Sequence, residues 1–202
     1  MSEIFNWKKN INKKELEKVI EVLKNDGIII FPTDTVYGIG CNCFSEKAIR
    51  KIFKDKSRPE QKPINVLTSN IEKIQRVAKN ISEKEEEIIK KYMPGALTII
   101  LNKRENVPLI LTAELDTIGV RIPNNKIALE ILNNFEYPLA TTSVNISGNL
   151  PGIELQDFLE EFKDKVDIII DGGKSEIGIA STIIRIDENS KINILRKGSI
   201  KL

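Results

Sequence analysis

Residues 28–40, IIIFPTDTVYGIG, place a short apolar run directly before a polar loop. The run IIIF at 28–31 predicts a buried strand, because its β-favouring residues are followed by turn-forming ones. In open α/β sheets, ligands bind outside the carboxyl ends of strands, where loops present hydroxyls and backbone N–H groups. The stretch is therefore either a binding loop, with Thr33, Thr35 and Tyr37 as candidates, or a polar turn that joins two strands.

Helices and strands alternate on both sides of this stretch. The apolar residues of 12–27 recur at helical spacing, with Asn12 and Glu15 as a capping-box-like start and Gly27 as the stop. Further helices are expected at 45–56, after Asn70, and at 82–93, 125–134 and 155–164. Further strands are expected at 64–67, 96–102, 117–123, 138–143, 167–171, 181–187 and 192–196. The pattern predicts an α/β fold with a mixed sheet.

Composition narrows the class of protein. A chain of 202 residues is most simply one compact domain, here residues 1–202 with a motif-bearing core at about 12–200. Hydrophobic residues are 41%, charged residues 30% and the net charge only +2, which argues against disorder and against a protein that coats polyanions. No apolar run approaches the roughly 20 residues that cross a bilayer, and the N-terminus lacks a signal-peptide core. A cytoplasmic protein is expected.

The chain has two cysteines and no histidine. Cys41 and Cys43 are too few to hold a metal, so we expect no metal site and interpret them as buried thiols. Without histidine, imidazole triads and common zinc sites are excluded. Any chemistry must use lysine, arginine, carboxylates, hydroxyls and the backbone.

The stretch DGGKS at 171–175 ends like a phosphate-binding loop, but a full match needs a glycine where Ile168 stands. The residues after Ser175 indicate a strand, whereas a phosphate loop runs into a helix. We interpret it as a turn between strands.

The stretch KDKSRPEQKP at 54–63 groups cations at a helix end. Pro59 restricts Arg58 to extended backbone, which would place Lys56 and Arg58 on one side as a two-pronged phosphate grip. The alternative is a solvated helix end, where cations favour the helix dipole.

The stretch ATTSVNISGNLPG at 140–152 concentrates short donors and acceptors after a strand. Such a loop can hold a nucleotide or an amino acid through hydrogen bonds. Three weaker pieces are DTIGVRIP, ASTIIRI and LRKG, whose candidate residues are Thr117, Arg121, Ser181, Thr182 and Arg196.

In order along the chain, PTDTVYGIG, Lys56-Ser57-Arg58, PGALTIIL, GVRIP, TTSVNISG, ASTIIR and LRKG resemble the YrdC domain of the threonylcarbamoyl-AMP synthase family. The family's KxR…SxN tetrad is complete here as Lys56, Arg58, Ser143 and Asn145. The resemblance implies a single-domain twisted mixed open sheet with flanking helices and a basic concave active-site cleft. Members of the family join L-threonine, bicarbonate and ATP into L-threonylcarbamoyladenylate and release pyrophosphate.

The resemblance also implies roles for residues. Threonine would be bound by Thr35, Arg121, Thr141 and Ser181. ATP would be bound by Arg58, Lys62, Thr117, Ser143, Asn145, Pro151 and Arg196, with Lys56 and Arg58 at the phosphates as the catalytic pair. Thr33, Tyr37, Ser147 and Thr182 are further loop candidates. Mg²⁺ would accompany ATP, held by phosphates and water more than by protein. Removing Lys56 or Arg58 would lower turnover far more than stability, on the premise that both are exposed.

Two departures from the family pattern stand out. Many relatives have NPL and then a histidine, where this chain has Lys62-Pro63-Ile64 and then Leu67, and the usual SAN is SVN. Longer members carry a C-terminal domain after a linker, so a chain that ends at Leu202 resembles the short form.

Other functions remain open at this stage. An RNA-binding module of the same fold is one, although few aromatic residues and a net charge of +2 argue against it. An enzyme similar to the carbamoyl-transfer domain of hydrogenase maturation proteins, or a paralogue with another carbamoyl or adenylate substrate, is a second. The product would pass to a tRNA threonylcarbamoyltransferase, with direct tRNA binding as an additional possibility and no membrane partner.

Overall fold

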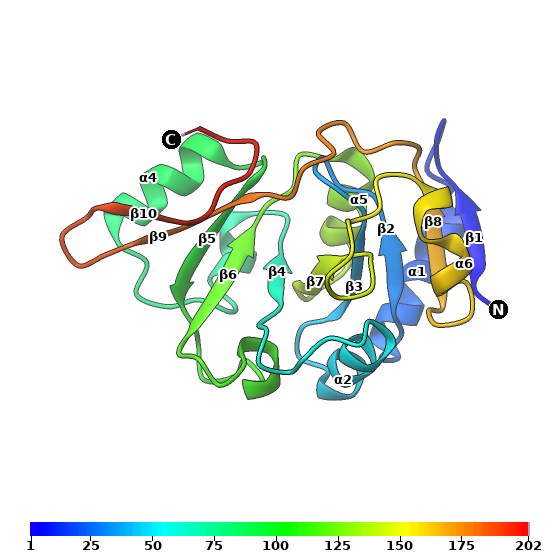
Figure 1. Ribbon diagram of the computed structural model, residues 1–202, viewed down its shortest axis with the longest axis horizontal. Helices are drawn as coiled ribbons and strands as arrows, with labels where there is room; N and C mark the ends of the chain where they lie inside the picture. The colour runs from blue at the N-terminus through cyan, green and yellow to red at the C-terminus, as the bar shows by residue number, and fades with distance from the viewer. Residues whose placement is uncertain (202) are drawn as a thin grey trace.

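The computed structural model describes residues 1–201 and contains one ten-stranded mixed sheet (Figure 1). The strand order is β1-β8-β2-β3-β7-β4-β6-β5-β9-β10. The strands are β1 Glu3–Asn6, β2 Ile29–Phe31, β3 Gly38–Asn42, β4 Asn65–Leu67, β5 Leu97–Asn102, β6 Thr117–Arg121, β7 Leu139–Ser143, β8 Ile168–Asp171, β9 Thr182–Ile186 and β10 Ile192–Arg196. The helices are α1 Lys13–Lys24, α2 Glu46–Asp55, α3 Ile71–Ile74, α4 Glu83–Tyr92, α5 Lys126–Asn134 and α6 Leu159–Phe162, with 3₁₀ turns η1 Leu109–Thr112 and η2 Leu155–Asp157. The predicted α/β class and mixed sheet are confirmed.

Two predicted helices differ in detail. Asn12 caps α1 by accepting from the backbone N–H groups of Lys14 and Glu15, but the Glu15 carboxylate accepts from the Trp7 indole N–H instead of completing a capping box. The helix expected at 155–164 is broken into η2 and α6. Strand β1 was not predicted, because Phe5 is its only buried residue and the strand lies at the edge of the sheet.

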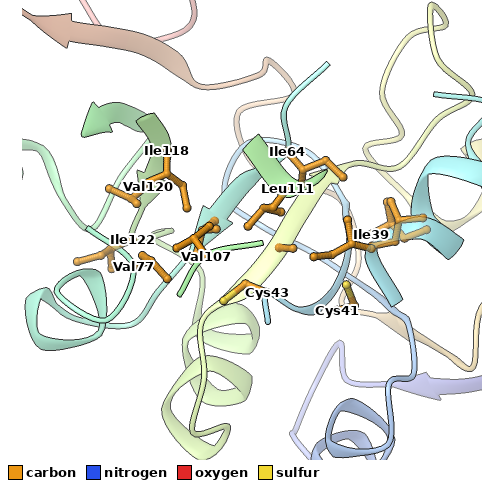
Figure 2. Packing of buried hydrophobic residues seen from close by; sticks show 14 of the residues in the cluster. Ile39, Cys41, Cys43, Ile64, Val77, Val107, Leu111, Ile118, Val120 and Ile122 are labelled. Carbon is orange, nitrogen blue, oxygen red and sulfur yellow. The ribbon is translucent and has the colours of Figure 1, made fainter. Parts of the chain in front are cut away.

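Helices cover both faces of the sheet. On one face α1 and α5 pack over Ile29, Phe31 and Ile168. On the other face α2, α4 and α6 pack over a larger core that includes Ile39, Cys41, Cys43 and Val120 (Figure 2). Both cysteines are free and fully buried, as expected, and burial raises their pKa.

The sheet face that carries α1 and α5 is hollow next to those helices. Leu139 and Thr141 of β7 lie on this same face, Leu139 in the core and Thr141 in the hollow. Glycines supply the space: a Cβ on Gly40 would lie 2.9 Å from the Thr141 hydroxyl, and one on Gly119 would lie 2.3 Å from the Asn65 side-chain oxygen. Real Cβ contacts are never so close, so the glycines allow the Thr141 and Asn65 side chains to lie over the neighbouring strands.

The DGGKS segment is a loop after β8, and no helix follows it before β9. The Tyr37 hydroxyl accepts from the Gly172 N–H and donates to the Gly173 carbonyl, so the segment is pinned to the 33–37 loop. A phosphate-binding loop is therefore excluded here. None of the helices within residues 1–201 combines the length and apolar character of a bilayer span.

Candidate active site

A polar pocket opens over the hollow sheet face and is bordered by the loops that follow β2, α2 and β8 and by the end of β7. Its lining residues are Thr33, Thr35, Val36, Tyr37, Gly38, Arg58, Pro63, Asn65, Leu67, Thr98, Arg121, Thr141, Thr142, Ser143, Ala180, Ser181 and Arg196. The lining includes three arginines and no carboxylate. A concave site with this charge suits anionic ligands.

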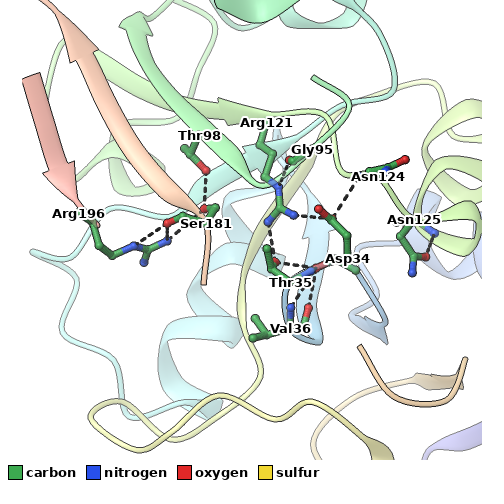
Figure 3. A network of polar contacts seen from close by, with 12 residues as sticks. Asp34, Thr35, Val36, Gly95, Thr98, Arg121, Asn124, Asn125, Ser181 and Arg196 are labelled. Carbon is green, nitrogen blue, oxygen red and sulfur yellow. Dashed lines mark hydrogen bonds and ion pairs between the residues drawn. The ribbon is translucent and has the colours of Figure 1, made fainter. Parts of the chain in front are cut away.

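Arg121, from β6, stands at the centre of a buried network (Figure 3). Its Nε donates to the Gly95 carbonyl at 2.8 Å, its Nη1 to the Thr35 hydroxyl at 2.8 Å, and its Nη2 to Asp34 Oδ1. The backbone N–H of Asn124 also donates to Asp34 Oδ1, at 3.1 Å. A guanidinium has five N–H donors, so two remain for a ligand after these contacts.

Burial affects the pKa of Arg121, the cation of this network. Arg121 is 5% exposed and Asp34 is 3% exposed. Burial lowers the pKa of Arg121, whereas the negative charge of Asp34 and its hydrogen bond raise that pKa. Arginine stays protonated in proteins, so the pair holds a fixed positive group at the pocket floor. Such a group matches a carboxylate.

A second network lies on the other side of the pocket, between β5, β9 and β10. The Thr98 and Ser181 hydroxyls are 2.8 Å apart, and both are buried. The Arg196 Nη2 donates to the Ser181 carbonyl at 2.9 Å and to its hydroxyl at 3.1 Å (Figure 3). Arg196 therefore enters the pocket wall in a fixed orientation.

Three loops interlock around the pocket. The Tyr37 N–H donates to Gly152, the Val144 N–H donates to Tyr37, and the Ile177 and Gly178 N–H groups donate to Asp34 and Thr35. These backbone bonds tie the 33–37 loop to the 144–152 and 172–178 loops. The pocket is thus pre-organised before any ligand binds.

The comparisons with known proteins point to one family. Residues 21–198 match the Sua5/YciO/YrdC family model, which carries the description "Telomere recombination". The chain belongs to this family. It is 36% identical over 202 residues to the threonylcarbamoyl-AMP synthase of Pyrococcus abyssi, covering all of this chain and 59% of that relative.

Solved structures agree with this assignment. The chain superposes on P. abyssi Sua5 complexed with L-threonine with a TM-score of 0.93 at 36% identity, over 96% of this chain and 57% of that one. It superposes on the MTH1692 protein from Methanobacterium thermoautotrophicum with a TM-score of 0.72 at 33% identity, over 96% and 90%. The chain thus spans less than two thirds of the P. abyssi relative and most of the second protein.

The two cations of the family's KxR motif, Lys56 and Arg58, lie in different environments. Lys56 is 1% exposed, and its ammonium donates to the Ser143 carbonyl at 2.5 Å, to the Asn145 carbonyl, and to Asn145 Oδ1 at 3.1 Å. The expected exposure of Lys56 is therefore wrong. Its pKa is lowered to about 7, mainly by burial and secondly by the charge of Arg58, while three accepting oxygens favour the ammonium form.

Arg58 does reach the pocket. Its Nε donates to the Lys62 carbonyl at 3.1 Å and its Nη2 to the Pro63 carbonyl at 2.8 Å. Ser57 between the two cations has φ +49°, a left-handed turn after α2, so Lys56 and Arg58 do not project to one side as extended backbone would require. The predicted two-pronged grip is corrected to one buried lysine and one pocket arginine.

The SxN pair is also divided. Ser143 lines the pocket, and its hydroxyl donates to Asn145 Oδ1 at 2.7 Å. The Asn145 amide donates to the Asn149 carbonyl at 2.7 Å, so Asn145 holds the loop and lies outside the pocket lining. Lys56 and Asn145 together fix the backbone that presents Ser143.

Nine of the predicted site residues line the pocket: Thr33, Thr35, Tyr37, Arg58, Arg121, Thr141, Ser143, Ser181 and Arg196. Five more, besides Lys56 and Asn145, were expected at the site. Lys62 contributes its carbonyl to Arg58, and Pro151 and Ser147 lie in the 144–152 loop. Thr117 lies at the far end of β6, in a separate hollow with Arg185 and Asn193. Thr182 is 1% exposed, and its hydroxyl donates to the Ile200 carbonyl and accepts from Gly198.

Sequence reasoning missed several contributors. Asp34 lies within the PTDT motif, but its ion pair with Arg121 was missed because the two residues are 87 positions apart in the sequence. Thr98 was a single hydroxyl within an apolar strand, which could have signalled a pocket. Asn65 and Leu67 face the pocket because Ile64 and Val66, the alternate positions, enter the core. Leu67, where many relatives have histidine, is 5% exposed and presents an apolar group.

Within residues 1–201, no group of three or more His, Cys, Asp or Glu could hold a metal ion. The pocket offers hydroxyls and an amide but no carboxylate. A magnesium ion that arrived with a nucleotide would thus find few protein ligands of the kind it prefers.

Lys56→Met should lower the free energy of unfolding by about 3 kcal/mol, because it leaves buried oxygens of residues 143 and 145 without a donor. Lys54→Met, at the exposed end of the same helix, is the matched control and should change stability by less than about 1 kcal/mol. Urea unfolding measures both. Equal losses in the two variants would contradict the buried role of Lys56.

Asp34→Ala should cost about 3–5 kcal/mol, because it leaves the buried Arg121 guanidinium uncompensated. Asp34→Asn should cost less, since its side-chain oxygen still accepts from Arg121 and from the Asn124 N–H. Glu86→Ala, which breaks an exposed pair with Lys90, is the control and should cost less than about 1 kcal/mol. If thermal and urea unfolding give the same loss of stability for Asp34→Ala and Glu86→Ala, the ion pair between Asp34 and Arg121 does not stabilise the fold.

Proposed function

We propose that this chain is an L-threonylcarbamoyladenylate synthase, which joins L-threonine, bicarbonate and ATP into threonylcarbamoyl-AMP and pyrophosphate. The observation that carries the proposal is one pocket lined by three arginines and no carboxylate, in which Arg121 is paired with Asp34 outside the lining. A buried guanidinium with free donors, Arg121, lies at one side, and Arg58 and Arg196 lie around the rest. The family and the threonine complex of the P. abyssi relative support the same reading.

In this proposal, threonine binds over β6 and the 33–37 loop. The free N–H groups of Arg121 pair with its carboxylate, and the hydroxyls of Thr35, Thr141 and Ser181 surround the rest of it. Each of these groups already has a partner within the protein, or a fixed rotamer, that limits its movement. Pre-organised donors of this kind lower the entropic cost of positioning.

ATP binds next to the threonine, with Arg58 and Arg196 as cations and Ser143 as a hydrogen-bond partner, and Arg196 adjoins the threonine site through Ser181. Burial lowers the pKa of both arginines, yet a guanidinium remains charged at neutral pH. Their charges offset the repulsion between an anionic carbamate and an anionic triphosphate, which is the main obstacle to the reaction. Mg²⁺ accompanies the phosphates and takes most of its ligands from phosphate and water.

The reaction needs little proton transfer by side chains. The threonine amine and bicarbonate give a carbamate and water, and a carbamate oxygen then displaces pyrophosphate from the α-phosphorus. Positioning and charge stabilisation therefore supply the catalysis, which a chain without histidine can provide. The labile product passes to a tRNA threonylcarbamoyltransferase in the cytoplasm, with direct tRNA contact as an additional possibility.

Pyrophosphate release from ATP should require both threonine and bicarbonate. The measurement uses purified protein, CO₂-depleted buffer and Mg²⁺, with threonine or bicarbonate omitted in turn. Equal release in all mixtures would reject the synthase. Salt-dependent RNA binding without turnover would favour an RNA-binding module, and turnover of carbamoyl phosphate would favour the hydrogenase-maturation type of reaction.

Arg58→Ala should lower kcat by about 100-fold, because it removes a fixed cation from the phosphate side of the pocket. Lys54→Ala is the matched control, since this lysine is exposed near the end of α2 and lies outside the pocket lining. Steady-state pyrophosphate release and urea unfolding are measured on both variants. An Arg58→Ala enzyme with the kcat of the wild type would show that Arg58 has no part in turnover.

A further inference from the structure

Asn65 is a pocket residue without an assigned role. It begins β4 and pairs with Thr141 of β7. On its other side the parallel register places it beside Gly119 of β6. Its side-chain oxygen occupies the space over that glycine, because a Cβ there would lie only 2.3 Å away. The strand thus aims a neutral amide at the pocket floor.

The amide of Asn65 is available to a ligand. The side-chain hydrogen bonds around it join Arg121 to Thr35 and Asp34, and Thr141 to the Leu139 carbonyl. None of the side-chain bonds found within residues 1–201 uses the Asn65 amide. An amide has two N–H donors and one accepting oxygen, and an unused amide in a pocket is a specific recognition group.

The position of Asn65 lies between the two cationic sides. Pro63, Asn65 and Leu67 all line the pocket, and alternate residues on a strand are about 6.6 Å apart. The Pro63 carbonyl accepts from Arg58, and Leu67 pairs with Arg121. Asn65 therefore sits midway between the proposed phosphate side and the proposed carboxylate side.

We propose that Asn65 binds the carbamate that forms on the threonine amine. This inference rests on the synthase function proposed above. With the threonine carboxylate at Arg121, we place its amine toward Asn65, the next pocket-facing position along β4 from Leu67. An amide N–H donates to a carbamate oxygen without the charge that would hold the product tightly. Asn65 thus orients the nucleophile toward the nucleotide.

Asn65 orients the carbamate for a condensation that releases pyrophosphate. The amine and bicarbonate lose one water and leave a carbamate with one negative charge. A carbamate oxygen then bonds to the α-phosphorus, and the bond from that phosphorus to the pyrophosphate oxygen breaks. The electron pair leaves with pyrophosphate. Asn65 neither gives nor takes a proton.

Asn65→Leu tests this role, because it keeps the approximate shape of the side chain and removes the amide. We expect kcat/KM for bicarbonate to fall about tenfold or more, the usual effect of losing a hydrogen bond to a charged group. The Kd for threonine, measured by calorimetry without bicarbonate and ATP, should stay within twofold of wild type. Asn65→Asp should lose more activity, since its charge repels the carbamate. Asn106→Leu, at an exposed asparagine, is the control and should match wild type.

Asn65→Ser keeps a hydroxyl donor and should recover part of the bicarbonate dependence. It also serves if Asn65→Leu does not fold. Unchanged kcat/KM for bicarbonate in these variants would overturn the inference, and so would an equal loss of threonine affinity, which would place the amide on the amino acid itself. A wild-type protein without threonine-dependent pyrophosphate release would instead reject the proposed function.

Discussion

The buried ion pair between Arg121 and Asp34 is the interaction on which the pocket depends. Arg121 belongs to β6, and Asp34 belongs to the loop after β2, four strand positions away in the sheet. The pair therefore joins two distant parts of the sheet across its hollow face. Two buried charges are costly to desolvate, and their attraction repays that cost only with further hydrogen bonds. The Gly95 carbonyl, the Thr35 hydroxyl and the Asn124 N–H supply them.

Polar groups that stabilise the protein and polar groups left for ligands are intermixed in this pocket. Lys56 uses all three of its donors on the loop that presents Ser143, so the most basic motif of the sequence contributes a structural residue and one pocket arginine. Arg196 is held by Ser181 in the same manner. The cations that face a ligand are those whose hydrogen bonds are incompletely used by the protein, which is why guanidinium groups, with five donors, serve here and lysine does not.

The sequence predicted the α/β class, most of the elements and the pocket arginines, because strand periodicity and ordered motifs are local signals. It could not predict the burial of Lys56. Pro59 restricts only Arg58, whereas Ser57 adopts a left-handed turn after α2, so Lys56 and Arg58 point in different directions. The contact between Asp34 and Arg121 and the position of Asn65 beside Gly119 could not be predicted either. Both depend on which strands are neighbours in the sheet. Strand β1 was not predicted because one buried residue in four shows no alternating pattern.

The concave floor explains why glycine and asparagine matter as much as charge. Arg58 and Arg121 attract anions, but attraction alone would draw two negative substrates to the cations without orienting them. The absence of a side chain at Gly40 and at Gly119 leaves room for the Thr141 hydroxyl and for the neutral amide of Asn65 in the pocket. A neutral group at the midpoint can align two anions without binding either strongly in the ground state, so the charge that develops between them is stabilised mainly in the transition state.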